Sequence, residues 1–458
     1  MIKEFFLILI LISNMHSQFH NAHSFKTTTT FDLGKNKAES LSINEFGNRL
    51  LVGGGQSGRI YLLDIETLTQ IETVEKLDLD NYIPDFAQVA LSRNRVSQDV
   101  YQEIDKVHAN VTDVHYLTGG RYALASVSFT SSKVKRHPLT KIGAVVLIDM
   151  VNFDLKSIRF TDARPEHIAI SYDHKYVLVI CQGYEDDFQE NLSTSGSIIK
   201  FEMIGADIYY SNHFSFSPET EALIRNVYSC PLGSIKYIPE SIVTDQNTYK
   251  TYVTLQKCNT ILELDIESSL VANVIRLNTT SHYADTQSDG VIAFDQSPTL
   301  VLEPDGITFN SSGTAIFTAN EGKMIDPLDL NQITGGRNIT GYRLNGERFY
   351  DSLHKTETNE ALTGMYKDQT SNTHGSQLED LTFGIIQSTE YLAVTAEKSN
   401  VVHFFDITQV ENVKYLGHVP VLGKAPEDII FSPHHKAFIT ANEKSNSISI
   451  IQFKTPTQ

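Results

Sequence analysis

Short apolar strands alternate with polar turns along most of this chain, and one arrangement of them recurs seven times. In each copy an acidic or polar residue opens a short strand of alternating positions, a polar turn follows, and a second apolar strand comes next. Two copies show this most clearly: EPDGITFNSSGTAIFTANEG from Glu303 and APEDIIFSPHHKAFITANEKSNSISIIQF from Ala425. Period-two alternation bounded by Gly, Asn, Asp and Pro is typical of antiparallel strands. The pattern therefore predicts seven copies of one antiparallel unit.

We expect these units to be the blades of one all-β, seven-bladed β-propeller spanning residues 25–458 as a single domain. The residues that open the units are Glu39, Thr112, Glu166, Glu240, Asp305, Glu379 and Glu427. The spacing of roughly 50 to 75 residues exceeds a minimal four-stranded blade, so the loops carry insertions, and 86–106 has weak helical periodicity. The last unit has three strands before Gln458, and Thr27–Leu33 offers the fourth. Pairing the two termini would close the last blade with the N-terminal strand and remove an exposed edge.

The first residues predict export. Lys3 precedes the apolar run Phe5–Ile12 and the polar stretch Ser13–Ser17, which is typical of a signal peptide over residues 1–17, cleaved after Ser17 or Ala22. A run this short cannot cross a bilayer, which needs about 20 apolar residues, so we expect no transmembrane segment. The net charge of -18 argues against a nucleic-acid partner. We expect a secreted or extracellular protein, either free or associated with a cell surface.

Cysteines and sequons fit that compartment. The three cysteines, Cys181, Cys230 and Cys258, predict one disulfide and one odd thiol. Cys181 and Cys258 occupy the same kind of loop in consecutive units, which favours the pair Cys181–Cys258; Cys230–Cys258 is the alternative. Glycosylation is predicted at the sequons that begin at Asn110, Asn191, Asn278, Asn310 and Asn338.

A candidate cation site follows from the propeller geometry. The loop that enters the innermost strand and the loop between the second and third strands lie on the same face of a propeller. Together they present a set of carboxylates and amides, with Gln182 and Gln256 at equivalent places: Glu166, Glu240, Asp305, Asn320, Glu321, Glu379, Glu397, Glu427, Asn442 and Glu443. Ca²⁺ takes roughly six to eight oxygen ligands, so two or three neighbouring blades could hold one ion. Ca²⁺ is accordingly the candidate cofactor.

The alternative interpretation of the opening acids is structural, because a feature repeated in almost every blade is readily explained by blade architecture. Each acid would accept backbone N–H bonds at a turn and tie one blade to the next. Asp113, Asp380 and Asp428 directly follow an opening residue, and we expect them to point the other way.

Other motifs predict ordinary loops. Gly53, Gly55 and Gly58 match G-x-G-x-x-G, but a strand follows where a phosphate cradle needs a helix. His434 and His435 lie in a turn on the opposite face. The acidic run Glu185, Asp186, Asp187 and Glu190 lacks the spacing of a calcium loop, and the group Asp78, Asp80 and Asp85 is interpreted as solvated in the same way.

The last unit, together with IPESIVTDQNTYKTYVTLQKCNTILELDI from Ile238, resembles the tyrosine-valine-threonine-asparagine class of surface propeller repeats. EPDGITFNSSGTAIFTANEG followed by QLEDLTFGII, LAVTAEKSN and FFDIT resembles the choice-of-anchor I family, which includes mesenchyme-specific cell surface glycoproteins. The resemblance covers residues 35–453 and implies an exported or surface-attached propeller without a well-defined reaction. After ANEG, relatives carry acidic and basic residues, whereas this chain continues Lys323, Met324, Ile325, Asp326, which weakens any transfer of a binding role to this loop.

Three functions remain at this point. The leading one is a non-enzymatic glycoprotein that binds a protein, a matrix or a small molecule through its acidic face, organised by a divalent cation. The alternative is a metal-dependent hydrolase of the lactonase or phosphoesterase type, in which a metal-bound water attacks. No His or Arg of the repeat converges with the acids, and no nucleophile elbow or zinc-helix motif occurs. The third is a structural coat or matrix protein.

Overall fold

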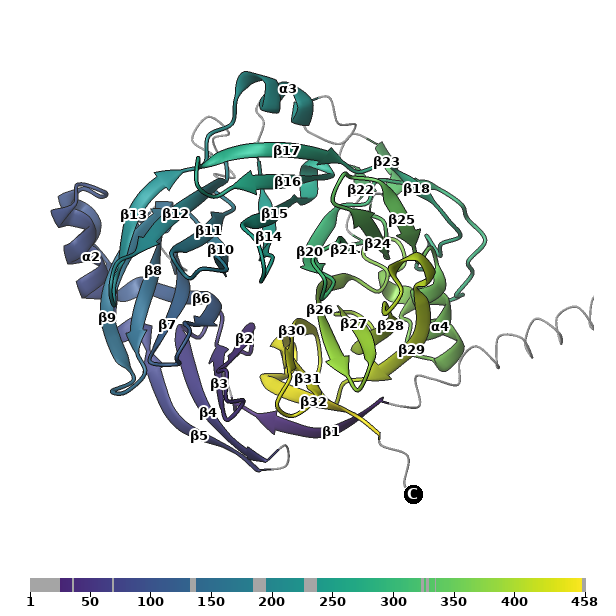
Figure 1. The fold of residues 1–458 in the computed structure, drawn as a ribbon, viewed down its shortest axis with the longest axis horizontal. Helices are drawn as coiled ribbons and strands as arrows, with labels where there is room; N and C mark the ends of the chain where they lie inside the picture. The colour runs from purple at the N-terminus through teal and green to yellow at the C-terminus, as the bar shows by residue number, and fades with distance from the viewer. Residues whose placement is uncertain are drawn as a thin grey trace, which may run out of the picture.

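The computed structural model describes residues 25–34, 37–67, 70–131, 137–183, 195–225, 237–322, 325–326, 329–333 and 335–454. They form a ring of seven four-stranded antiparallel sheets, the blades, around a central axis (Figure 1). The predicted seven-bladed propeller is confirmed. The predicted signal peptide lies outside the described residues.

Each blade contains four consecutive strands, except where the insertion of blade 5 and the closure of blade 7 intervene. Blades 1 to 4 consist of β2 (Ser40–Ile43), β3 (Arg49–Gly53), β4 (Arg59–Thr67), β5 (Gln70–Asp78); β6 (Val107–Tyr116), β7 (Tyr122–Ser131), β8 (Ile142–Asp149), β9 (Asp154–Asp162); β10 (Pro165–Ile170), β11 (Tyr176–Cys181), β12 (Ser197–Met203), β13 (Ile208–His213); and β14 (Pro239–Thr244), β15 (Lys250–Leu255), β16 (Thr260–Asp265), β17 (Leu270–Arg276). Blades 5 to 7 consist of β20 (Pro304–Phe309), β21 (Ala315–Asn320), β24 (Asn338–Arg343), β25 (Arg348–Asp351); β26 (Leu378–Ile386), β27 (Thr389–Ala396), β28 (Val401–Asp406), β29 (Lys414–Pro420); and β30 (Pro426–Ser432), β31 (Ala437–Asn442), β32 (Ser447–Phe453) with β1 (Phe25–Asp32).

The two ends of the chain share blade 7, as predicted. β1 pairs antiparallel with β32 from Phe25↔Phe453 to Asp32↔Ser447, and Figure 1 shows the purple N-terminal strand beside the yellow C-terminal one. The aromatic ring of Phe25 stacks on Phe404 of blade 6 at a centroid distance of 4.0 Å. The N-terminal strand therefore completes one blade and also packs against the next.

The apolar core is divided among the contacts between blades. The described residues form seven clusters of buried apolar side chains, and each cluster joins two neighbouring blades. Leu147 of blade 2 packs in this way with Val177 and Phe201 of blade 3. The second strand of a blade is covered on both faces and is accordingly buried almost throughout, as in β11 and β21.

The insertions carry three α-helices among the described residues: α2 (Ile83–Ser92), α3 (Pro218–Arg225) and α4 (Lys355–Thr363). The helical periodicity at 86–106 is confirmed only at its start, since α2 ends at Ser92 and short 3-10 turns follow. Phe86 of α2 packs edge-on against Phe129 of β7 at 5.1 Å. None of the helices in the described part of the chain is long and apolar enough to cross a membrane.

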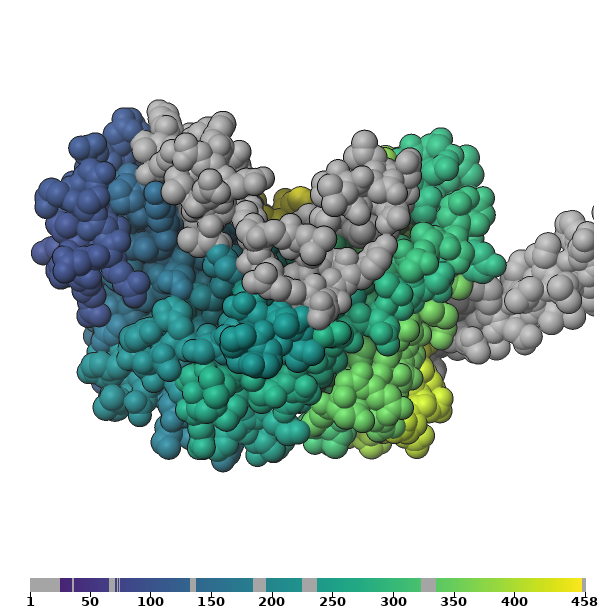
Figure 2. Space-filling view, turned by 90° about the horizontal axis from the view of Figure 1, so that it is seen from above, coloured from purple at the N-terminus to yellow at the C-terminus, as the bar shows by residue number. Residues whose placement is uncertain are grey.

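The insertion that carries α2 precedes β6, an innermost strand, so it lies on the face where the opening residues lie. Seen edge-on, this blue segment stands above the ring on one side (Figure 2). We call this side of the ring the acidic face.

Candidate functional site

The blades bring the two predicted loops together by one recurring backbone contact. The residue two positions before the opening acid has a left-handed φ of about +54° to +58° at Arg164, Glu303, Gln377 and Ala425. The carbonyl oxygen of each of these residues accepts a bond from the first backbone N–H of the second loop, as in Glu321 N to Glu303 O at 3.1 Å and Glu397 N to Gln377 O at 2.8 Å. Such a φ costs a non-glycine residue free energy, so the four turns are held by the surrounding structure.

The acids that tie the blades together are not the opening ones but those that follow them. Asp113 Oδ2 accepts from Ile168 N of the next blade at 2.7 Å, Asp380 Oδ2 from Ile429 N at 3.2 Å and Asp428 Oδ2 from Leu41 N at 2.5 Å. The expectation that these aspartates turn away from the opening acids agrees with these contacts. The opening carboxylates take no part in these three contacts.

Three of the predicted ligands form one cluster. Asp305 and Glu379 open blades 5 and 6, and Glu321 follows β21 of blade 5. Each offers a carboxylate oxygen, and these oxygens all lie within 4.8 Å of one another. The Glu379 carboxyl group lies close enough to Asp305 to influence its pKa. We call Asp305, Glu321 and Glu379 the carboxylate triad.

Two buried glutamines hold the triad. Gln256 Nε2 donates to Asp305 Oδ2 at 3.1 Å and to Glu321 Oε2 at 2.6 Å, and Gln377 Nε2 donates to Glu321 Oε1 at 2.8 Å. Gln377 is more than nine-tenths buried, and its carbonyl oxygen Oε1 has no hydrogen-bond partner. A buried oxygen without a donor is costly, and a cation is one group that could satisfy it.

The electrostatics of the triad favour a positive ligand. Burial first, and then the charges of Glu321, Glu240 and Glu427, raise the pKa of Asp305 well above its usual range. Burial and the charges of Glu427 and Glu321 do the same to the pKa of Glu379. Carboxylates this close together repel one another when they are all ionised, and a shared proton or a bound cation relieves that repulsion.

The remaining predicted acids do not join the triad. Glu397 pairs with Lys398 and Lys444, which lower the pKa of Glu397 against the effect of burial, and Glu443 pairs with Lys37. Three opening acids belong to other blades, and burial raises the pKa of each: Glu166 to about 8, Glu240 to about 7 and Glu427 well above its usual range. The carboxylate triad therefore contains only some of the acids that the sequence predicted as ligands.

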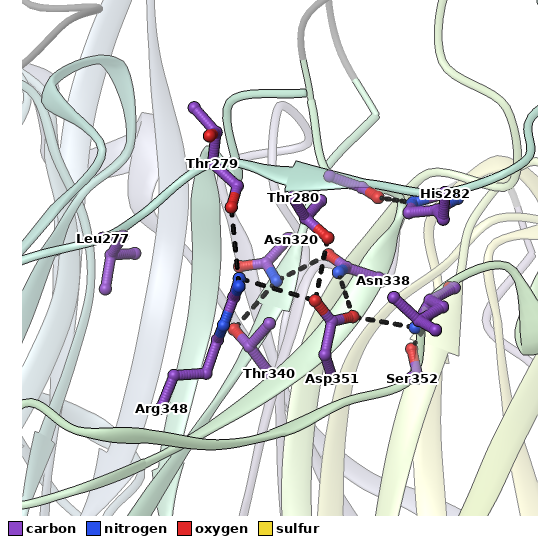
Figure 3. Close-up of polar contacts among 12 residues, drawn as sticks. Leu277, Thr279, Thr280, His282, Asn320, Asn338, Thr340, Arg348, Asp351 and Ser352 are labelled. Atoms are coloured by element: carbon purple, nitrogen blue, oxygen red, sulfur yellow. Dashed lines mark hydrogen bonds and ion pairs between the residues drawn. The ribbon is translucent and has the colours of Figure 1, made fainter. Parts of the chain in front are cut away.

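Asn320 and Asn442 act inside their own blades. Asn320 is fully buried, donates to Asn338 Oδ1 at 2.9 Å and Thr340 Oγ1 at 3.0 Å, and accepts from Thr318 Oγ1 at 2.9 Å (Figure 3). Asn442 donates in the same way to Ser449 Oγ at 2.9 Å. Both amides lock the second strand to the third, so they are not available as the metal ligands they were predicted to be.

The predicted glycosylation sites differ in how far their asparagine side chains are buried. Asn338 is fully buried, and its amide nitrogen donates to Asp351 Oδ1 at 2.7 Å (Figure 3). Asn310 is buried in a turn and donates to Ser312 Oγ at 2.7 Å. The burial of both side chains disfavours a glycan there in the folded chain, and glycosylation at the sequons stays a prediction. Asn110 lies half-buried in β6 and donates to Ser128 Oγ, Asn278 is exposed, and Asn191 lies outside the described residues.

The predicted Cys181–Cys258 disulfide is not formed. Cys181 is a free, fully buried thiol, and burial raises its pKa. It packs with Leu124 and Val179 between blades 2 and 3, whereas Cys258 packs with Leu255 between blades 3 and 4. The two sulfurs therefore belong to different apolar clusters. The alternative pair Cys230–Cys258 stays a prediction, because Cys230 lies outside the described residues.

The lesser motifs are turns, apart from the run Glu185–Glu190, which lies outside the described residues. Gly55 and Gly58 have positive φ angles in the link from β3 to β4. His435 Nε2 contacts Gly47 O at 2.8 Å and so joins the turns of blades 7 and 1. Asp80 accepts from Ala109 N at 2.8 Å, which makes it a loop anchor.

Sequence reasoning missed Gln377, whose amide positions Glu321. Its signal was its place, two residues before the opening acid, where the other blades carry Arg164, Glu303 and Ala425. A position at which the members of a repeat differ can carry a function particular to one blade.

Fold and site together define a β-propeller with a carboxylate triad at one end of its axis. The choice-of-anchor I domain model matches residues 39–366, and the chain belongs to this family. No curated protein matches the sequence. Among solved structures, a chain of hydrazine synthase from Kuenenia stuttgartiensis is similar, with a TM-score of 0.57 and 12% identity over 93% of this chain and 98% of that one. A likeness at this identity shows the fold alone.

Proposed function

We propose that this protein is an exported, surface-associated propeller that binds its partners without catalysis, and that a divalent cation at the carboxylate triad organises its acidic face. Membership of the choice-of-anchor I family supports the surface role. The predicted signal peptide supports export. We also propose that the chain is related more specifically to mesenchyme-specific cell surface glycoproteins and to propellers with tyrosine-valine-threonine-asparagine repeats.

The observation that carries the cation is the spacing of the triad oxygens. Ca²⁺ lies about 2.4 Å from its oxygen ligands, so two oxygens on opposite sides of one ion lie about 4.8 Å apart. The oxygens of Asp305, Glu321 and Glu379 fall within that limit. The partnerless carbonyl of Gln377 supplies a further candidate ligand, and water would complete the shell.

The hydrolase alternative lacks a comparable observation. A metal-bound water needs a base, and the developing charge needs a donor. In the hydrogen bonds given for the triad, the amides of Gln256 and Gln377 donate to the carboxylates themselves, so these amides position the acids and supply no base. The triad therefore favours binding over hydrolysis.

Thermal unfolding of the chelator-treated protein, titrated with Ca²⁺, Mg²⁺ and Mn²⁺, tests the proposal. An ion that binds only the folded state adds about 2.7 kcal/mol at a hundredfold excess over Kd, which is roughly 3 °C for a chain of this length. We expect a saturable rise with Ca²⁺ that is lost in Asp305→Asn and Glu321→Gln. The matched control is Glu166→Gln, which removes an opening acid outside the triad and should keep the rise. No rise at millimolar ion would remove the cation from the proposal.

A further inference from the structure

A cavity of about 580 Å³ lies at the end of the axis opposite the acidic face. Its lining comes from the ends of the innermost strands and the turns after them in blades 1 to 4, including Ile43, Tyr116, Ile170 and Thr244. The opening acids precede those same strands, so the length of a strand separates the two ends. A volume in the range of roughly 300–1,000 Å³ is usual for small-molecule sites.

The wall of the cavity offers neutral hydrogen-bonding groups. The His115 ring makes no hydrogen bond with the described residues. Burial together with neighbouring His174 lowers the pKa of His115 to about 4, so the ring is uncharged and presents one donor and one acceptor. His174 contacts the Thr118 hydroxyl at 2.9 Å. Gln246 adds an amide on the side of blade 4.

The floor and rim are apolar and aromatic. Ile168, Ile170 and Ile242 line the inner surface. Tyr172 lines the cavity with 38% of its surface exposed, and Tyr249 packs edge-on against its ring at 4.5 Å. The Tyr249 hydroxyl donates to Asp173 Oδ2 at 2.8 Å, which fixes the supporting ring. Tyr172 is thus an exposed aromatic surface held in place from behind.

The charges of the lining exclude most other ligand classes. No lysine or arginine occurs among the described residues that line the cavity, so a phosphate, sulfate or carboxylate would have no counter-charge. The oxygens of Asp245 already accept from Thr248 and Asn247, and Glu45 is exposed. One carboxylate of the lining is thus held by hydrogen bonds within the protein and the other is solvated, which weakens the attraction of either for an ammonium group.

We propose that this cavity is a binding site for an uncharged sugar. The ring of such a sugar presents a C–H face that packs on Tyr172 and the isoleucine floor, and hydroxyl groups that can both donate to and accept from His115, Thr118 and Gln246. The site is independent of the carboxylate triad, because none of the triad residues lines the cavity.

Saturation-transfer NMR with methyl glucoside, methyl galactoside, methyl mannoside and N-acetylglucosamine tests this site in the presence of chelator. We expect transfer from at least one probe with a Kd on the order of 1 mM, the affinity usual for a ligand of this size. Tyr172→Ala should weaken binding at least tenfold, and His115→Phe should weaken it by a similar factor, because it removes the donor and the acceptor of the ring. The matched control is Tyr209→Ala, an exposed tyrosine of blade 3 outside the cavity.

Absence of transfer from every probe would overturn the proposal, and so would equal binding by the wild type and both cavity variants. Displacement of the sugar by tetramethylammonium at equal concentration would overturn it in favour of an amine site. Because the triad variant Glu321→Gln should retain sugar binding, a failed cation titration and a failed sugar titration are separate outcomes.

Discussion

Asp113 Oδ2 accepts a hydrogen bond from Ile168 N at 2.7 Å and joins the innermost strands of blades 2 and 3. The same carboxyl group accepts from Val114 N at 2.8 Å in its own blade. In a ring whose blades are otherwise joined largely by apolar side chains, this contact fixes how one inner strand meets the next. The same contact recurs at Asp380 and Asp428, each of which directly follows an opening acid, so in those blades the second acid holds the blades and the opening acid takes no part in the contact.

Replacing Asp113 should therefore weaken the ring rather than a binding site. Asp113→Ala leaves the buried N–H of Ile168 without an acceptor, which costs about 1–3 kcal/mol. Asp113→Asn keeps one acceptor oxygen and should lose less. Thermal unfolding measures both, with Asp105→Ala, an exposed acid that precedes β6, as the control. Equal stability of the Ala variant and the wild type would show that the bond does not hold the blades together.

The repeat itself made most of the fold predictable. Seven copies of one antiparallel unit predicted a ring of seven blades. The last unit lacked a fourth strand, which predicted that the N-terminal strand, observed as Phe25–Asp32, closes the ring. The same reasoning placed both loops on one face, because that follows from strand order alone. The order of the strands can be predicted without knowledge of individual side-chain contacts.

The assignment of individual acids depends on side-chain direction, which the repeat leaves open. A register shift lies at the opening of the strand pairs, for example between Pro165 and Ile168 and between Leu378 and Leu381, and it interrupts the simple alternation of side chains on which the sequence prediction relied. Lys398 and Lys444, adjacent in sequence to Glu397 and Glu443, were visible as possible counter-ions. The burial of Asn338 was not visible, because a three-residue sequon contains no information on packing.

The raised pKa values predict an unusual pH dependence for the cation-free protein. Burial raises the pKa of Glu39, Asp113 and Glu240 to about 7 and of Glu166 to about 8. The folded state then holds more protons than the unfolded state, whose carboxyls have a pKa of about 4, so stability falls as pH rises through the folded values. We expect the melting temperature in chelator to decrease between pH 6.5 and 8.5.

That window avoids the opposing effect of the histidines. His115 and His167 have their pKa lowered to about 4, so they reduce stability only as pH falls below about 6.5. Glu166→Gln, which cannot ionise, should flatten the decrease, and Ca²⁺ should flatten it further by taking the place of protons at the triad. A melting temperature that rises steadily with pH in chelator would contradict the assignment of buried, proton-holding carboxyls.

Asn320→Ala should destabilise the fold without affecting the cation response. The substitution leaves the Thr318 hydroxyl and Asn338 Oδ1 without the bonds they make to this amide, a loss of about 1–3 kcal/mol. The rise in melting temperature with Ca²⁺ should be unchanged, since the triad is intact. Loss of that rise in Asn320→Ala, with the basal fold preserved by circular dichroism, would return Asn320 to the ligand set.

Alkylation should distinguish the cysteines. The Cys181 thiol is buried and its pKa is raised, so iodoacetamide should label it only after unfolding. A non-reducing peptide map should then show the Cys230–Cys258 pair, the remaining possibility once Cys181 is free. Recovery of a Cys181–Cys258 peptide from protein alkylated before unfolding would restore the pairing that the structure does not contain.

Phe25→Ala should loosen the closure of the ring. Besides stacking on Phe404, the Phe25 ring packs edge-on against Tyr391 at 5.0 Å and Phe453 at 5.3 Å, and it is buried. Removing a buried phenylalanine ring costs about 3–5 kcal/mol, or roughly 3–5 °C in melting temperature for a chain of this length.

Phe31→Ala removes a half-buried ring from the same strand and serves as the control, with a smaller loss. Hydrogen exchange adds a local readout, because faster exchange confined to β1 and β32 in Phe25→Ala locates the loss at the closure. Uniform acceleration around the ring would show instead that the N-terminal strand does not hold the two ends together.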